Sequence, residues 1–188
     1  MSSHHDRAAA LPAFDTAWSA FLLIASAAGS LAFACVTPFA ALATVAAMTL
    51  PFRLALATMT GAWLFNQAIG FLVLTYPVSG DSLLWGLTLG LSALAALAAA
   101  HRVAKRVGDR PAPARWIAGL AAAFLVQQGL LLAASGVLGS GDGFTATVIG
   151  GVVSLDMLWT LALAAIYGLV SAVRLGMSPF HLRRTQSM

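Results

Sequence analysis

The stretch LALATMTGAWLFNQAIGFLVLTYP, residues 54–77, has the length of a membrane-spanning helix and carries two side-chain amides, Asn66 and Gln67, at its centre. A helix needs about 20 apolar residues to cross a bilayer. Hydrocarbon offers no hydrogen-bond partners, so an amide at this depth faces protein, water or a ligand. The stretch therefore predicts a membrane helix whose polar side points into a bundle.

Two later apolar stretches repeat this feature. Gln127 and Gln128 lie at the centre of one, and Asp156 lies near the middle of the other, with no Lys or Arg at its depth. We predict that these positions meet inside the bundle and line a polar pocket walled by tryptophans, as small-molecule sites usually are. The predicted ligand-binding residues are Asn66, Gln67, Gln128, Asp156, Trp63 and Trp159. The alternative is that the polar groups bond one another and hold the helices together.

The composition indicates an integral membrane protein. The 188 residues are 60% hydrophobic and 9% charged, whereas soluble domains carry about 25% charged residues. The mean hydropathy is +0.90. Because the basic residues lie in short segments between apolar stretches, the pI near 10.2 does not point to nucleic acid. The sequence predicts one polytopic all-α domain over residues 1–188.

Six apolar segments are the candidate spans of this bundle. The second is short, about 20 Å as a helix against a hydrocarbon core of about 30 Å. It could be a short span that thins the bilayer or is shielded by its neighbours, or it could be a re-entrant arm. The first ends in Ala32-Phe33-Ala34, which also resembles a signal-peptide cleavage site, but we favour an uncleaved span. The segments are residues 18–36, 38–51, 54–77, 82–100, 116–138 and 144–173.

The charges predict the orientation. With six spans and the N-terminus inside, every Lys and Arg falls on the cytoplasmic side, as the positive-inside rule requires. The cytoplasmic parts are then a polar, mobile tail (residues 1–15), a basic loop (101–115) and a basic C-terminal tail (175–188). A re-entrant second segment leaves five spans and moves the N-terminus outside. We expect a multi-pass protein of the cell (inner) membrane.

Catalysis has little support in the residues. The chain has one cysteine, and it lacks HExxH, GxSxG and a pair of deep carboxylates. His4-His5 is a weak metal-binding candidate, and the plainer interpretation is a flexible tail. We therefore predict a protein that is not an enzyme, with no cofactor, no resident metal and no nucleic-acid partner. An intramembrane enzyme remains a third, weaker hypothesis.

The short spans, the Ala-rich early helices and two stretches, TPFAALATVAAMTLP (residues 37–51) and GAWLFNQAIGF (residues 61–71), resemble the substrate-binding S components of energy-coupling-factor transporters. The resemblance implies binding and uptake of a vitamin-like molecule or a metal ion, together with a transmembrane coupling subunit and ATPases. It also implies that Ala28 and Ala32 face the coupling subunit. His4-His5 departs from the N-terminal histidine of the metal-type members. The alternative function is a non-catalytic structural subunit or assembly factor of a membrane complex.

Overall fold

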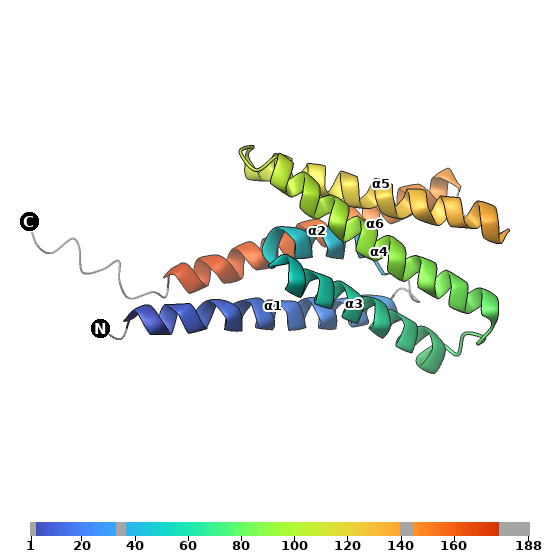
Figure 1. Ribbon diagram of the computed structural model, residues 1–188, viewed down its shortest axis with the longest axis horizontal. Coiled ribbons are helices and arrows are strands. Elements are labelled where there is room, and N and C mark those ends of the chain that lie inside the picture. The colour runs from blue at the N-terminus through green and yellow to red at the C-terminus, as the bar shows by residue number, and fades with distance from the viewer. Residues whose placement is uncertain (1–2, 33–36, 140–144, 177–188) are drawn as a thin grey trace, which may run out of the picture.

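The computed structural model describes residues 3–32, 37–139 and 145–176, with side chains from Ala13 to Arg174 within these ranges. The described residues are almost entirely helical and include no strand. Five of the helices are long and apolar enough to cross a membrane, which confirms the prediction of an all-α membrane bundle. The elements are α1 (Ser3–Ala32), α2 (Phe39–Thr49), α3 (Phe52–Ala68), the π-helical turn η1 (Ile69–Val73), α4 (Gly80–Arg106), α5 (Ala112–Leu138) and α6 (Ala146–Gly176) (Figure 1).

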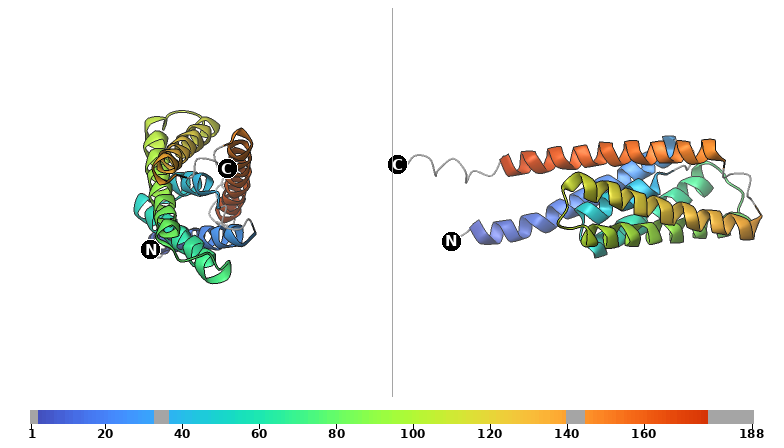
Figure 2. Two further views of the ribbon diagram at one scale, coloured as in Figure 1. Left: turned by 90° about the vertical axis from the view of Figure 1, so that its right-hand side faces the viewer. Right: turned by 90° about the horizontal axis from the view of Figure 1, so that it is seen from above.

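The short helix α2 lies at the centre of the bundle. Viewed from the end, the five long helices surround it (Figure 2), and α2 contacts every one of them. Its residues 39–47 are all buried. They are mostly alanine, and such small side chains let helix backbones approach closely. Neighbouring helices thus shield this segment, and whether it is a short span or a re-entrant arm stays a prediction.

The ring of long helices has sparse seams on both sides of α6, toward α5 and toward α1. α3 packs against α1 and α4, and α4 packs closely against α5, whereas α5 and α6 contact each other little. α6 instead packs against α2, and its Tyr167 ring meets Trp18 of α1 at a centroid distance of 5.2 Å. The outer surface carries many exposed leucines, isoleucines and valines, as expected for helices that face lipid.

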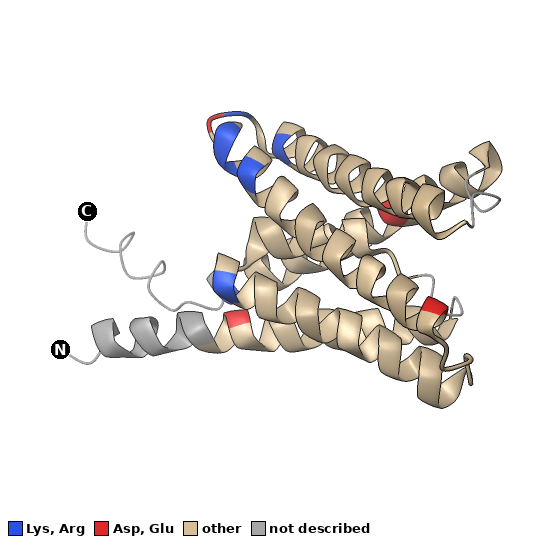
Figure 3. Cartoon of the chain, turned by 45° about the vertical axis from the view of Figure 1, so that its right-hand side comes forward, with Lys and Arg blue, Asp and Glu red and all other residues tan. Residues whose placement is uncertain are grey.

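The charged residues are segregated along the bundle. The Lys and Arg residues of the described ranges gather at one end of the bundle (Figure 3). Asp81 lies in the first turn of α4, toward the opposite end. Lys105 and Arg106 occupy the last turn of α4, where positive charge stabilises the negative end of the helix dipole. This arrangement agrees with the charge distribution along the sequence.

Two predicted boundaries are wrong. Residues 3–15, predicted as part of a mobile tail, continue α1 as helix. Ala8, Ala9 and Ala10 favour helix strongly, and a formed helix extends more easily than a new one begins. The basic segment 101–115 is mostly helix as well, because α4 runs to Arg106 and α5 starts at Ala112. Only residues 107–111 connect them. The C-terminal tail from residue 177 lies outside the described residues.

Candidate functional site

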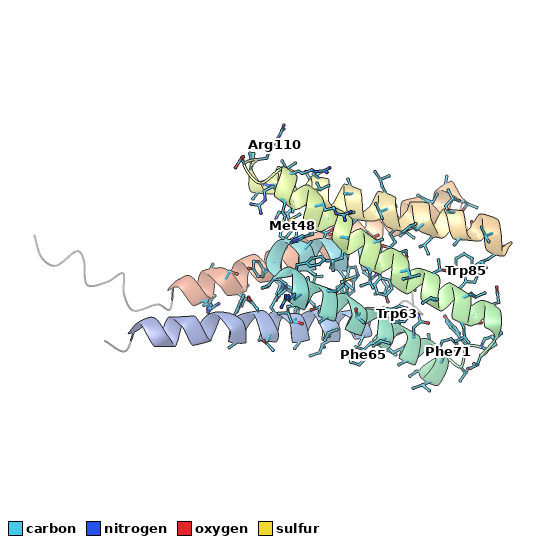
Figure 4. The ribbon with its side chains drawn as sticks, viewed as in Figure 1. Met48, Trp63, Phe65, Phe71, Trp85 and Arg110 are labelled. Atoms are coloured by element: carbon cyan, nitrogen blue, oxygen red, sulfur yellow. The ribbon has the colours of Figure 1, made fainter. Side chains whose placement is uncertain are left out.

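A cavity of about 440 Å³ lies between α3, η1 and α4, with Leu131 of α5 contributing to its wall. Three aromatic residues line it: Phe71, Tyr76 and Trp85. Figure 4 labels Phe71 and Trp85 near the end of the bundle that is far from Arg110. The polar lining residues are Asn66, Gln67, Asp81 and Ser82. A concave, largely apolar site with some aromatic residues and a few polar groups has the make-up of a small-molecule pocket.

The backbone departs from regular helix beside this cavity. α3 ends at Ala68 and continues as η1, in which the Leu74 N–H bonds to the Ile69 carbonyl at 2.9 Å. Such π-helical turns occur frequently at functional sites. The next residue, Thr75, has φ 55°, which is a strained conformation for a β-branched side chain. Together the turn and Thr75 bring Tyr76 back over the cavity, where its N–H bonds to the Gly70 carbonyl at 3.0 Å.

Two glycines of α4 receive side chains from α3. The Trp63 Nε1–H donates to the Gly86 carbonyl at 2.8 Å, and a Cβ placed on Gly90 would lie 2.6 Å from the Trp63 ring. The side-chain oxygen of Gln67 lies against Gly86. Trp63 thus fills the space between the two helices (Figure 4). The close contact between α3 and α4 at Gly86 and Gly90 is therefore made by side chains that pack against glycine backbone.

Asn66 is the hub of a buried hydrogen-bond network. Its side chain is 2% exposed, and its Nδ2 donates to Thr37 Oγ1 at 2.8 Å and to Ser30 Oγ at 3.2 Å. Gln67 Nε2 donates to Asn66 Oδ1 at 3.3 Å. The network joins the last turn of α1, the residues just before α2 and the last turn of α3. It positions the Gln67 amide at the cavity wall.

Asp156 lies elsewhere, against the start of α2. It is 2% exposed, and its Oδ1 accepts a hydrogen bond of 2.9 Å from the Ala41 N–H. The first N–H groups of a helix have no partner within that helix, and the membrane interior supplies no water. Pro38, the residue before α2, provides no side-chain cap. Asp156 therefore caps α2 from α6, which gives the acid a structural role.

A second cavity, of about 250 Å³, also touches Asp156. It lies at the sparse seam between α5 and α6, and its other lining residues are apolar, among them Phe124 and Met157. Asp156 is thus both bonded to a backbone amide and adjacent to a cavity. The cavity is separate from the one that Asn66 and Gln67 line.

The six predicted ligand-binding residues do not meet in one pocket. Asn66 and Gln67 line the larger cavity and Asp156 the smaller one, while Trp63, Gln128 and Trp159 line neither. Trp159 packs instead against Gly29 of α1. Any role in ligand binding stays a prediction for all six. Ala28 and Ala32 are exposed on α1, and their contact with a partner helix also stays a prediction.

The prediction placed Gln128 of α5 in the pocket, whereas the buried amide of this pair is Gln127. Gln127 is 4% exposed, and its Oε1 has no hydrogen-bond partner among the described residues. Gln128 is only half-buried. The helix rotation that decides between the two depends on packing against α4 and α2, which a run of two glutamines does not specify.

Sequence reasoning missed most of the larger cavity. Phe71, Tyr76, Asp81 and Trp85 lie near span ends, where aromatic residues usually anchor a helix at the membrane surface. The available signal was their spacing, because these aromatics and an acid flank one short connection between two helices.

No group of three or more His, Cys, Asp or Glu side chains in the described ranges is arranged to hold a metal ion. No protein-family model matches this chain, and no curated protein or solved structure shows significant similarity to it.

Proposed function

We propose that this protein binds a small organic molecule in the cavity between α3, η1 and α4 and takes part in its uptake across the cell (inner) membrane. The observation that carries the proposal is the cavity itself. Its volume of about 440 Å³ falls in the range typical of ligand pockets, about 300–1,000 Å³. The π-helical turn and the strained Thr75 at its wall are features that concentrate at functional sites.

We further propose six passes with both termini inside, counting α2 as the short second pass. The clustering of Lys and Arg at one end supports this orientation. The cavity would then lie near the outer surface, as uptake requires. By its resemblance to S components, the protein would work with a transmembrane coupling subunit and ATPases. Ala28 and Ala32, exposed on α1, would meet the coupling subunit.

The orientation predicts which residues a membrane-impermeant thiol reagent reaches. In a Cys35→Ser background, Val78→Cys should be labelled in intact cells. Arg110→Cys should be labelled only after the cells are permeabilised. Both residues are exposed and lie at opposite ends of the bundle. A difference in labelling would therefore reflect the side of the membrane and not burial within the protein. Labelling of Arg110→Cys in intact cells, with Val78→Cys protected, would reverse the topology.

Ligand binding predicts a thermal shift. A panel of water-soluble vitamins and their precursors should contain a compound that raises the melting temperature of the detergent-solubilised protein. At 100 times its Kd, a ligand stabilises the native state by about 2.7 kcal/mol. Trp85→Ala removes an aromatic wall, and Gly86→Leu places a side chain in the cavity, so both should abolish the shift.

The control is Leu84→Ala, which changes an exposed residue next to Trp85 on α4 and should retain the shift. A shift that survives both cavity variants would place the ligand elsewhere.

A structural subunit is the second candidate function. Asn66 and Asp156 both form hydrogen bonds to other helices or segments of the chain. Polar residues that hold membrane helices together form such bonds, and this favours the structural role. This candidate predicts that no compound of the panel shifts the melting temperature and that another membrane protein co-purifies in a fixed ratio.

A further inference from the structure

The larger cavity carries a net negative charge. Among the described residues that line it, Asp81 is the only acidic one, and no Lys or Arg is among them. The described Lys and Arg residues gather at the other end of the bundle (Figure 3). Apolar walls focus the field of a charged group and raise the local concentration of counter-ions. The cavity therefore attracts positive charge.

The N-terminus of α4 also lies at this cavity. Its partial positive charge offsets only part of the negative charge of Asp81. A helix N-terminus carries about half a positive charge, against the full negative charge of Asp81 in its first turn. Two of the N–H groups that could bind an anion are already occupied. The Ser82 N–H bonds to Ser79 Oγ at 3.2 Å, and the Leu83 N–H bonds to the Ser79 carbonyl at 3.0 Å. An anionic ligand would have to approach against Asp81.

The aromatic walls supply the second element of a cation site. Phe71, Tyr76 and Trp85 all line the cavity, and the faces of such rings attract cations, most strongly for tryptophan. Aromatic side chains together with a carboxylate recognise ammonium groups without requiring a hydrogen-bond donor on the ligand. The remaining apolar lining suits an apolar or aromatic body attached to the charged group.

We propose that the cavity selects an organic cation, meaning an amine or a quaternary ammonium group joined to an aromatic or apolar body. The proposal rests on the proposed function and adds the chemical class of the ligand to it. Asp81 provides charge attraction, and the aromatic residues bind the ammonium group and the body.

The test uses phenyltrimethylammonium as the probe, measured by equilibrium dialysis against the full chain in detergent at low salt. Benzoate is the anionic comparison, and tert-butylbenzene is the neutral isostere. We expect the cation to bind more tightly than either. Because Asp81 is exposed, Asp81→Asn should weaken cation binding about two- to fivefold, and Asp81→Glu should restore much of it. Asp109→Asn, which removes an acid at the opposite end, should leave binding unchanged.

The outcomes separate this inference from the proposed function. If Gly86→Leu blocks a bound molecule but benzoate or tert-butylbenzene binds better than the cation, the cavity is a ligand site and the charge preference is wrong. Equal binding of the cation to wild type and Asp81→Asn also overturns the role of Asp81. If phenyltrimethylammonium does not bind to wild type, the inference fails, whereas the proposed function still depends on the vitamin panel.

Discussion

Replacing Asp156 with leucine should lower the free energy of unfolding by about 2–4 kcal/mol, because the Ala41 N–H at the start of α2 then loses its partner. The residue is almost fully buried, and no water in the membrane interior can replace the carboxyl oxygen. Chemical or thermal unfolding in detergent measures the change.

Asp156→Asn should be much milder. Its amide oxygen can still accept the hydrogen bond from Ala41, so we expect a loss of no more than about 1 kcal/mol. Ser154→Ala, at an exposed position on α6, is the control. Equal stability of Asp156→Leu and wild type would show that α2 does not need this cap.

The same variants address the ligand hypothesis for Asp156. The residue lines the smaller cavity and not the larger one, so Asp156→Asn should keep the ligand-induced thermal shift. Loss of that shift in a stably folded Asp156→Asn protein would show that Asp156 contributes to ligand binding.

Gly90→Leu should destabilise the protein by about 3 kcal/mol, the upper part of the range for an overpacked core. Even the first added carbon would lie 2.6 Å from the Trp63 ring. The rigid ring cannot turn away without breaking its hydrogen bond to the Gly86 carbonyl. The clash should exceed the gain of up to about 1 kcal/mol in helix propensity that replacing glycine provides. Melting in detergent gives the comparison.

A double-mutant cycle shows whether Trp63 is the cause. Trp63→Ala removes the clashing ring, so Gly90→Leu should be far less harmful in that background. Gly86→Ala is the matched control, because its added carbon meets the flexible end of Gln67. We expect only a small loss of stability there. Additive effects of Trp63→Ala and Gly90→Leu would contradict this account.

Local properties of the sequence determined the membrane character, the helical class and most of the spans. Hydropathy depends on composition over about 20 residues, so long apolar stretches indicate membrane helices wherever they pack. The buried position of Asn66 followed in the same way, because an amide in mid-span must leave the lipid. The segregation of basic residues to one end also follows from their positions along the chain.

Only the tertiary structure decided what the polar residues do. Asp156 meets Ala41 across 115 positions of sequence, and nothing local to either residue specifies that contact. The larger cavity depends on a π-helical turn, on the positive φ of Thr75 and on two glycines that accept side chains from another helix. These features arise where helices pack, and the energy of packing depends on contacts between distant segments. Periodicity shows which side of a helix is polar, whereas the partner that this side meets is set by the fold.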